Sequence, residues 1–581
     1  MKRRKFLQSA GMGAPAALAA ASPAAQSGAS GRKPGAEPRA FFYDDGRHAS
    51  GLYQFAPPLE PHDLAFAVDQ LVSSGIDTLI YSAGLEGGTV QYNSHVAAKW
   101  GDNVEVWKHE IFYRASRNLH HLIANGHDPM KLLCDRSHEK GLLFLPTLPV
   151  CIVGGDRAED LGYGRKSDFV YDHPEFYVGE DPHPLAKQLG RFFGPRRMSF
   201  LHAEVRRERF LIFEELLWRY DSDGIEIDLS IDNEFGPFCR FAEVEDLKPV
   251  LTEWIRGIRR AARRAEEDQG RRKRVYVRIP AGGRQAWDLA GFDVPVWVRE
   301  KLVDGFICIT AAKKETPQGR RLLLDQDLDL APVVALTRGT GVRVLAGSRG
   351  TLGRQLEANA TREMIWASAA LAYFHGADGF GLCDGMWAPN GWPWTSDDYQ
   401  TLRLLGHPDM LATADKRYMA RSLARGADSK DGLFPIEGPL LPQELAVGRS
   451  LTVPLTIADD LPKWSAQGRV KTVRLSLRLT NFELGLNEVE VEFNGRGLPD
   501  SIRRESDLHF RVVKNFALNP YGYVLEYLLP PVWYPKPGMS HVTVRLVRRD
   551  PKLTLPVELY DLDCAIEYRL HRHFQAEPVS Y

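Results

Sequence analysis

The sequence lacks several signals that mark other protein classes. Its six cysteines are scattered and form no Cys-x-x-Cys pair, so neither a disulfide framework nor a zinc site is expected. The histidines have no HExxH or facial-triad spacing, and no motif predicts a metal or a cofactor. Lys+Arg 74 against Asp+Glu 75 leaves a net charge of −1, which gives no overall attraction to nucleic acid or an anionic membrane. The basic run from Arg259 to Arg274 interleaves with acidic residues and is typical of a solvated helix end.

Long apolar runs are also missing. Beyond the N-terminus no stretch of about 18 apolar residues occurs, so no membrane span is predicted. The chain starts with basic residues and the Arg3-Arg4-x-Phe6-Leu7 pattern of a twin-arginine export signal, followed by an Ala-rich stretch. We expect a signal peptide over 1–25 and a flexible Gly-, Ser- and Pro-rich linker over 26–39. The protein is then exported already folded, to a bacterial periplasm or beyond, which suits cysteines that need no pairing.

Short apolar segments alternate with amphipathic helical patterns from residue 40 to about 411. The eight strand candidates are Ala40–Asp44, Asp77–Ser82, Leu142–Leu148, Gly224–Leu229, Val275–Ile279, Gly305–Thr310, Val342–Ala346 and Gly379–Cys383. This alternation predicts a closed parallel (β/α)₈ barrel, the TIM barrel, over 40–436. The alternative, an open doubly wound sheet, lacks the Gly-rich phosphate loop expected after its first strand.

The pattern changes after about residue 437. Six segments there alternate apolar and polar residues between Gly, Pro and Asn: Arg474–Leu479, Glu488–Phe493, His509–Val513, Tyr523–Leu529, His541–Val547 and Glu558–Tyr568. This predicts a C-terminal antiparallel β-sandwich of jelly-roll-like type over 437–581. A carbohydrate-binding role for this domain is one expectation.

The two ends of the predicted barrel strands differ. Three strands begin with the same dipeptide, Asp223-Gly224, Asp304-Gly305 and Asp378-Gly379, each after a helix and a short turn. The connections that follow the strands are much longer, for example from Ala83 to His127 and from Cys151 to Leu201. Because barrels build their active sites from the loops at the carboxyl ends of their strands, we look for chemistry there.

The fourth strand, Asp223 to Ser230, carries the most informative residues. Its apolar side chains, at positions 225, 227 and 229, share one face and must meet the helix layer. Glu226 and Asp228 therefore point into the barrel, with Asp228 nearer the carboxyl end. The fifth strand turns Arg278 inward beside them by the same alternation. Since a buried charge requires a partner, we expect Arg278 to pair with Glu226 or Asp228.

This trio has two interpretations. It is either a buried ion network that stabilises the barrel or part of a reactive centre. For Glu226, which lies deeper, the two interpretations are evenly balanced. For Asp228 the reactive interpretation is favoured, because catalytic groups gather at the carboxyl ends of barrel strands.

The same region resembles a known family. The stretch Glu204-Val-Arg-Arg-Glu … Arg219-Tyr-Asp-Ser-Asp-Gly-Ile-Glu-Ile-Asp228 is similar to the "PEVR…RYDVDGIxLD" phrase of the glycosyl-hydrolase-like barrel proteins related to family ten. Gly376-Ala-Asp-Gly-Phe380 is also similar to theirs. The resemblance covers the barrel and implies that Asp228 is a catalytic nucleophile. The β-glycosidase pattern of an Asn-Glu pair on the fourth strand and a Glu on the seventh is absent.

Glycoside hydrolysis needs a second carboxyl group about 5–9 Å from the first. The candidates are Asp232 and Glu234 after the fourth strand, Glu86 after the second and Asp384 after the eighth. Asp384 opens a stretch with three tryptophans, Trp387, Trp392 and Trp394. These rings either offer flat faces to a sugar or pack the loop onto the barrel rim, and three in one loop favour sugar binding.

The sequence thus predicts an exported glycoside hydrolase that acts on a poly- or oligosaccharide. Asp228, Asp384 and Glu234 are the catalytic candidates, and the substrate-binding candidates are Glu226, Arg278, Trp387, Trp392, Trp394 and Glu86. One alternative is a barrel that binds glycans without cleaving them. Another is a polysaccharide lyase, which needs a Tyr, Lys or His base in place of two acids.

Overall fold

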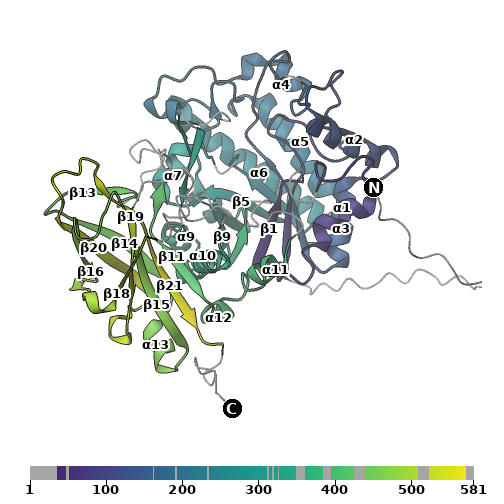
Figure 1. Cartoon of the computed structure of the whole chain (residues 1–581). Helices are drawn as coiled ribbons and strands as arrows, with labels where there is room; N and C mark the ends of the chain where they lie inside the picture. The colour runs from purple at the N-terminus through teal and green to yellow at the C-terminus, as the bar shows by residue number, and fades with distance from the viewer. Residues whose placement is uncertain are drawn as a thin grey trace, which may run out of the picture.

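A computed structural model describes most of the 581-residue chain (Figure 1). The described residues are 36–46, 51–160, 162–189, 193–231, 234–309, 313–316, 319–324, 326–348, 360–383, 394–423, 439–507 and 522–570. The helix-covered barrel and the C-terminal strands lie side by side in Figure 1. The predicted signal peptide over 1–25 lies outside the described residues, as does most of the predicted linker.

Eight parallel strands close a barrel in the order β1-β10-β9-β6-β5-β4-β3-β2. Their bounds are Ala40–Asp44 (β1), Thr78–Ser82 (β2), Leu143–Pro149 (β3), Gly224–Asp228 (β4), Arg274–Pro280 (β5), Gly305–Ile309 (β6), Arg343–Ser348 (β9) and Gly379–Leu382 (β10). These are the eight strands predicted from the sequence, with every boundary within two residues. The predicted closed (β/α)₈ barrel is confirmed, and the open-sheet alternative is excluded.

Helices cover the outside of the barrel. The longer ones are α1 (Pro61–Asp69), α2 (Glu110–Ala124), α3 (Pro129–Glu139), α5 (Ala203–Arg219), α6 (Val244–Gln269), α10 (Arg362–Phe374) and α11 (Ser396–Arg403). The shorter ones are α4 (Asp168–Asp172), α7 (Arg284–Ala290), α8 (Val294–Arg299), α9 (Ala331–Thr337) and α12 (Pro408–Leu411). In α6, Leu247, Leu251 and Ile258 are buried at helical spacing, which is why this helix packs against the strands. Arg260 is exposed, but Arg259 is buried and pairs with Asp304, so the basic run is not solvated throughout as expected.

Aspartates at the amino ends of four strands make the same contact. Asp77, Asp223, Asp304 and Asp378 each precede a strand and accept a hydrogen bond from a backbone N–H of the neighbouring strand, at 2.8 to 3.2 Å. Glycine follows three of them. At Gly224 the backbone φ is +134° and an added Cβ would overlap the backbone of Arg274, so only glycine fits. The repeated Asp-Gly dipeptide is thus a device that joins adjacent strands.

The C-terminal region forms two antiparallel sheets. One contains β11 (Lys416–Met419), β21 (Val557–Tyr568), β15 (Val470–Thr480), β19 (Gly522–Leu528) and β18 (Arg503–Ser506), with β13 (Gln443–Leu445) also paired to β21. The other contains β14 (Ser450–Ile457), β20 (Gly538–Arg548), β16 (Glu488–Phe493) and β17 (Arg496–Gly497). Apolar side chains of both sheets share one hydrophobic core, and helix α13 (Leu461–Ala466) adds Leu461 to it.

Some C-terminal details differ from the sequence expectation. Strand β11 joins the C-terminal sheet although it precedes the expected boundary at residue 437, which itself lies outside the described residues. A hairpin of β7 (Lys313–Thr316) and β8 (Gly319–Leu324) follows β6 and pairs with β12 (Ser422–Leu423). The periodicity of these short segments is too brief to predict them. The strand expected at 509–513 lies outside the described residues.

Over the part of the chain that the structure describes, no helix is long and apolar enough to cross a membrane. All six cysteines are buried free thiols.

Candidate active site

Arg278 binds two carboxylates inside the barrel. Its Nε donates to Glu226 Oε1 at 2.8 Å and its Nη1 donates to Asp228 Oδ2 at 3.0 Å. Strands β4 and β5 are adjacent, and Asp228 lies directly opposite Arg278 in their register. The side chains of Arg278, Glu226 and Asp228 are 3%, 0% and 5% exposed. The predicted pairing of Arg278 is therefore confirmed, and the guanidinium contacts both acids.

The other oxygen of Asp228 is fixed by its own strand end. Ser230 donates to Asp228 Oδ1 twice, from its backbone N at 2.8 Å and from its Oγ at 2.6 Å. With Arg278 on Oδ2, donors hold both carboxylate oxygens in one orientation. A carboxylate held in this way at the carboxyl end of a barrel strand is suited to act as a nucleophile or a base.

Glu226 lies one layer deeper than Asp228. Thr147, on β3, donates its hydroxyl to Glu226 Oε2. Burial raises the pKa of the Glu226 carboxyl to about 7, and the negative charge of Asp228 acts in the same direction, while Arg278 and Thr147 oppose it. Burial opposes the charge of Arg278, but the two carboxylates outweigh it and raise the pKa of the guanidinium. Burial therefore favours the protonated form of Glu226 more than its contacts with Arg278 and Thr147 oppose it.

Tyr43 completes the cluster from the far side of the barrel. The guanidinium carbon of Arg278 lies 4.6 Å from the centre of the Tyr43 ring, a cation–π contact. Strand β1 is opposite β5 in the closed barrel, so this contact crosses the interior. Tyr43 was not among the site residues predicted from the sequence. Its position near the carboxyl end of β1 was visible in the sequence, but its contact with Arg278 was not.

Glu234 and Glu86 also lie near the carboxyl ends of the strands. Glu234 is buried, and its backbone exchanges two hydrogen bonds with Ile231, at 2.8 and 3.0 Å, which close a short turn after β4. Glu86 accepts from Arg165 at 2.7 Å. The backbone N–H of Val153 donates to the backbone oxygen of Glu86 at 2.8 Å, so Glu86 lies beside the segment that follows β3.

The remaining candidates are described only in part. Asp232, Asp384, Trp387 and Trp392 lie outside the described residues. Trp394 is described, and its ring meets Phe42 edge-on at 5.2 Å and Tyr399 at 5.9 Å. The structure thus ties Trp394 to β1 and α11.

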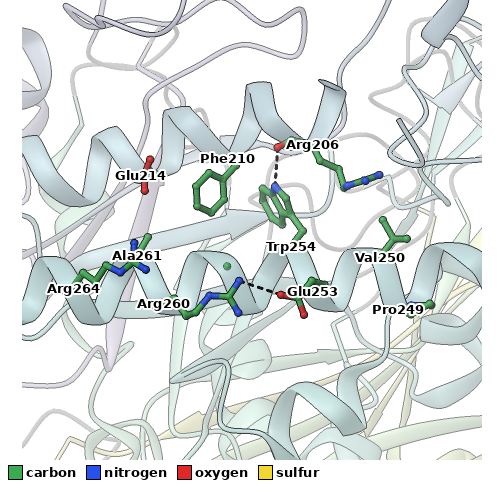
Figure 2. A pocket seen from close by; sticks show the side chains of 11 residues that line it. Arg206, Phe210, Glu214, Pro249, Val250, Glu253, Trp254, Arg260, Ala261 and Arg264 are labelled. Carbon is green, nitrogen blue, oxygen red and sulfur yellow. Dashed lines mark hydrogen bonds and ion pairs between the residues drawn. The ribbon is translucent and has the colours of Figure 1, made fainter. Parts of the chain in front are cut away.

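A groove of about 610 Å³ lies between α5 and α6, away from this cluster (Figure 2). The indole N of Trp254 donates to the backbone oxygen of Arg206 at 2.9 Å, and Arg260 pairs with Glu253 at 3.1 Å. All of its lining residues come from these two helices, so it is an outer-wall feature and shares no residue with the cluster around Asp228.

Within the described ranges, no group of three or more His, Cys, Asp or Glu side chains is arranged to hold a metal ion. The arrangement around Asp228 is instead one of carboxylates, a guanidinium and hydroxyl groups. Such groups position and transfer protons and stabilise charge directly.

Comparisons with known proteins give structural likeness alone. No family model and no curated protein matches this sequence. Among solved structures, an α-L-fucosidase from Paenibacillus thiaminolyticus matches with 10% identity and a TM-score of 0.38, over 64% of this chain and 49% of its own. An endo-β-1,4-mannanase from Thermotoga petrophila matches with 10% identity and a TM-score of 0.37, over 90% and 97%. An α-amylase from Geobacillus thermoleovorans matches with 8% identity and a TM-score of 0.38, over 87% and 98%.

This chain therefore spans about half the length of the fucosidase that it matches. At such low identities and TM-scores, these likenesses do not assign an activity to this chain.

Proposed function

We propose that this chain is an exported glycoside hydrolase that cleaves a poly- or oligosaccharide with paired carboxylates at the carboxyl end of its barrel. The observation that carries the proposal is Asp228: a buried, inward-facing carboxylate at the end of β4, held by Ser230 and Arg278. A barrel strand end is where catalytic groups gather, and two carboxyl groups are what glycoside hydrolysis requires.

Asp228 acts as the nucleophile or the base in this proposal. The Arg278 guanidinium stabilises the negative charge that this role needs. Glu234 or Asp384 serves as the acid that protonates the leaving oxygen, and Glu86 and the tryptophans Trp387, Trp392 and Trp394 contact the sugar. Glu226 and Arg278 support Asp228 from below.

The wider context belongs to the same proposal. A twin-arginine signal over 1–25 exports the folded protein to the periplasm or beyond, and the chain is related to the glycosyl-hydrolase-like barrels of the family-ten type. The C-terminal sheets form a jelly-roll-like sandwich that binds carbohydrate. The shared core of the two sheets supports the sandwich arrangement.

The test is a screen of wild type and Asp228→Asn on a panel of glycosides and polysaccharides. The substitution removes the charge at little cost in volume, so folding and glycan binding should persist while hydrolysis falls on the order of 10⁴-fold. If the variant cleaves a substrate as fast as the wild type, Asp228 is not catalytic. If the wild type binds glycans and cleaves none of them, the chain is a binding protein.

A further inference from the structure

One hydrogen-bond donor in the cluster around Asp228, the Nη2 atom of Arg278, has no acceptor in the part of the chain that the structure describes. Nε and Nη1 of Arg278 are occupied by Glu226 and Asp228, whereas Nη2 is buried. A buried charged donor without an acceptor is costly, and native proteins rarely keep one without a reason. A bound molecule that supplies an oxygen atom is such a reason.

A leftover nitrogen is not enough to mark a site, as Arg274 shows. Arg274 lies on the same strand and the same face, at the amino end, and its Nη1 is also buried and without an acceptor among the described residues. There the chain itself closes the barrel end, because Arg274 binds Glu37 at 2.9 Å and the backbone oxygen of Ala36 at 2.6 Å. Arg278 differs because it shares its guanidinium with Asp228 at the end where the long loops lie.

The charges around Arg278 decide what kind of oxygen suits its free nitrogen. One guanidinium faces two carboxylates, Glu226 and Asp228, and the ring of Tyr43 adds no charge. The net charge of the three ionisable groups is −1 when both acids are ionised and zero when Glu226 holds a proton. In neither state does positive charge remain to attract an anion, so a neutral hydroxyl oxygen is favoured over a carboxylate.

The guanidinium also fixes where that hydroxyl lies. Its nitrogens form one rigid planar fork, so a group bound to Nη2 lies beside the carboxylate bound to Nη1. If Asp228 faces the C1 carbon of the sugar, the nearest ring hydroxyl is the one on C2. Hydrogen bonds to this hydroxyl strengthen in the transition state of glycoside hydrolysis.

We propose that Nη2 of Arg278 donates to the C2 hydroxyl of the sugar that Asp228 attacks, so that the sugar in this subsite must carry a free C2 hydroxyl. The proposal rests on the glycosidase function proposed above and names its substrate class. Arg278 is then a specificity-determining residue as well as the partner of two acids.

The experiment uses the full-length protein and a p-nitrophenyl glycoside of the sugar that the screen identifies. Its 2-deoxy analogue is measured beside it. Because 2-deoxy glycosides differ in intrinsic reactivity, the ratio of parent to 2-deoxy analogue is compared between enzymes and not read alone.

Arg278→Lys keeps a positive charge near the two acids but loses the planar fork. The ratio of kcat/KM for parent and 2-deoxy analogue should fall roughly 10- to 100-fold relative to wild type. Arg274→Lys is the matched control: it changes the same residue type on the same face of the same strand, and it should keep the wild-type ratio.

Two results overturn the inference and leave the proposed function intact. One is a wild type whose substrate in the screen carries no free C2 hydroxyl, an observation that needs no variant. The other is an Arg278→Lys enzyme with the wild-type ratio, which means that water satisfies Nη2. Failure of the wild type to cleave any glycoside or polysaccharide of the screen overturns the proposed function and this inference with it.

Discussion

The two ends of the barrel use carboxylates in different ways. At the amino end, Asp77, Asp223, Asp304 and Asp378 repeat one contact, in which a carboxylate accepts from the backbone N–H of the neighbouring strand. At the carboxyl end, Asp228 and Glu226 depart from the repeat and share Arg278. A contact that recurs around a symmetric fold serves the fold, whereas a cluster that occurs on one strand pair needs another explanation.

The cost of the two arrangements differs as well. Each amino-end carboxylate accepts a backbone donor, which favours its charged form, although burial still raises the pKa of Asp77. At the carboxyl end, one cation serves two buried acids, and burial shifts the pKa of Glu226 to about 7. Functional sites are where proteins keep such unfavourable electrostatics, and the guanidinium shared by two buried acids is the feature that distinguishes Asp228 from the amino-end aspartates.

The largest effect on stability is expected from Arg278→Met. The change leaves Glu226 and Asp228 buried without their cation, so unfolding should require about 3–5 kcal/mol less free energy. Arg274→Met should cost less, because Glu37 is partly exposed and keeps Arg272 as a partner at 2.6 Å. Urea denaturation of both variants measures this, and equal losses would remove the distinction between the two ends.

A smaller effect concerns pH and Glu226. The folded protein holds the Glu226 proton up to about pH 7, whereas the ordinary value for this carboxyl is 4.5. The folded state therefore binds more protons between these values, and this group lowers stability as pH rises through that window. In wild type, this group should lower the free energy of unfolding by an amount on the order of 2 kcal/mol between pH 4.5 and 7. Glu226→Gln should abolish this decrease. Parallel pH profiles of unfolding free energy for wild type and variant would refute the shift.

The smallest effect is expected at the amino end, from Asp378→Ala. This removes the acceptor for the Val344 N–H, which lies at 2.8 Å, and should cost about 1–2 kcal/mol of unfolding free energy. Because this contact belongs to the fold, kcat on the substrate from the screen should stay within about twofold of wild type. Thermal unfolding and initial rates measure both, and a large loss of kcat in the folded variant would show that the amino end also serves catalysis.

Strand periodicity and alternation predicted much of this molecule. The eight barrel strands followed from the pattern, and the Arg278 pairing followed because alternation places it beside Glu226 and Asp228. Tyr43 was missed because its contact joins residues 235 positions apart across the closed barrel, which a local pattern does not contain. The same reason applies to β11, whose partner β21 lies far along the chain. The sequence did not identify the second catalytic carboxyl group, because several carboxylates follow the barrel strands.

The central claim is that the catalytic carboxylate lies at the carboxyl end of β4. Asp228 and Asp223, at the two ends of this strand, allow a direct test. Asp228→Asn and Asp223→Asn are the same substitution at the two ends of the strand, both at buried positions. The measurement is kcat per folded molecule on the substrate found in the screen. The account predicts a loss on the order of 10⁴-fold for Asp228→Asn and a change within a fewfold for Asp223→Asn. Equal rates for the two folded variants would contradict it.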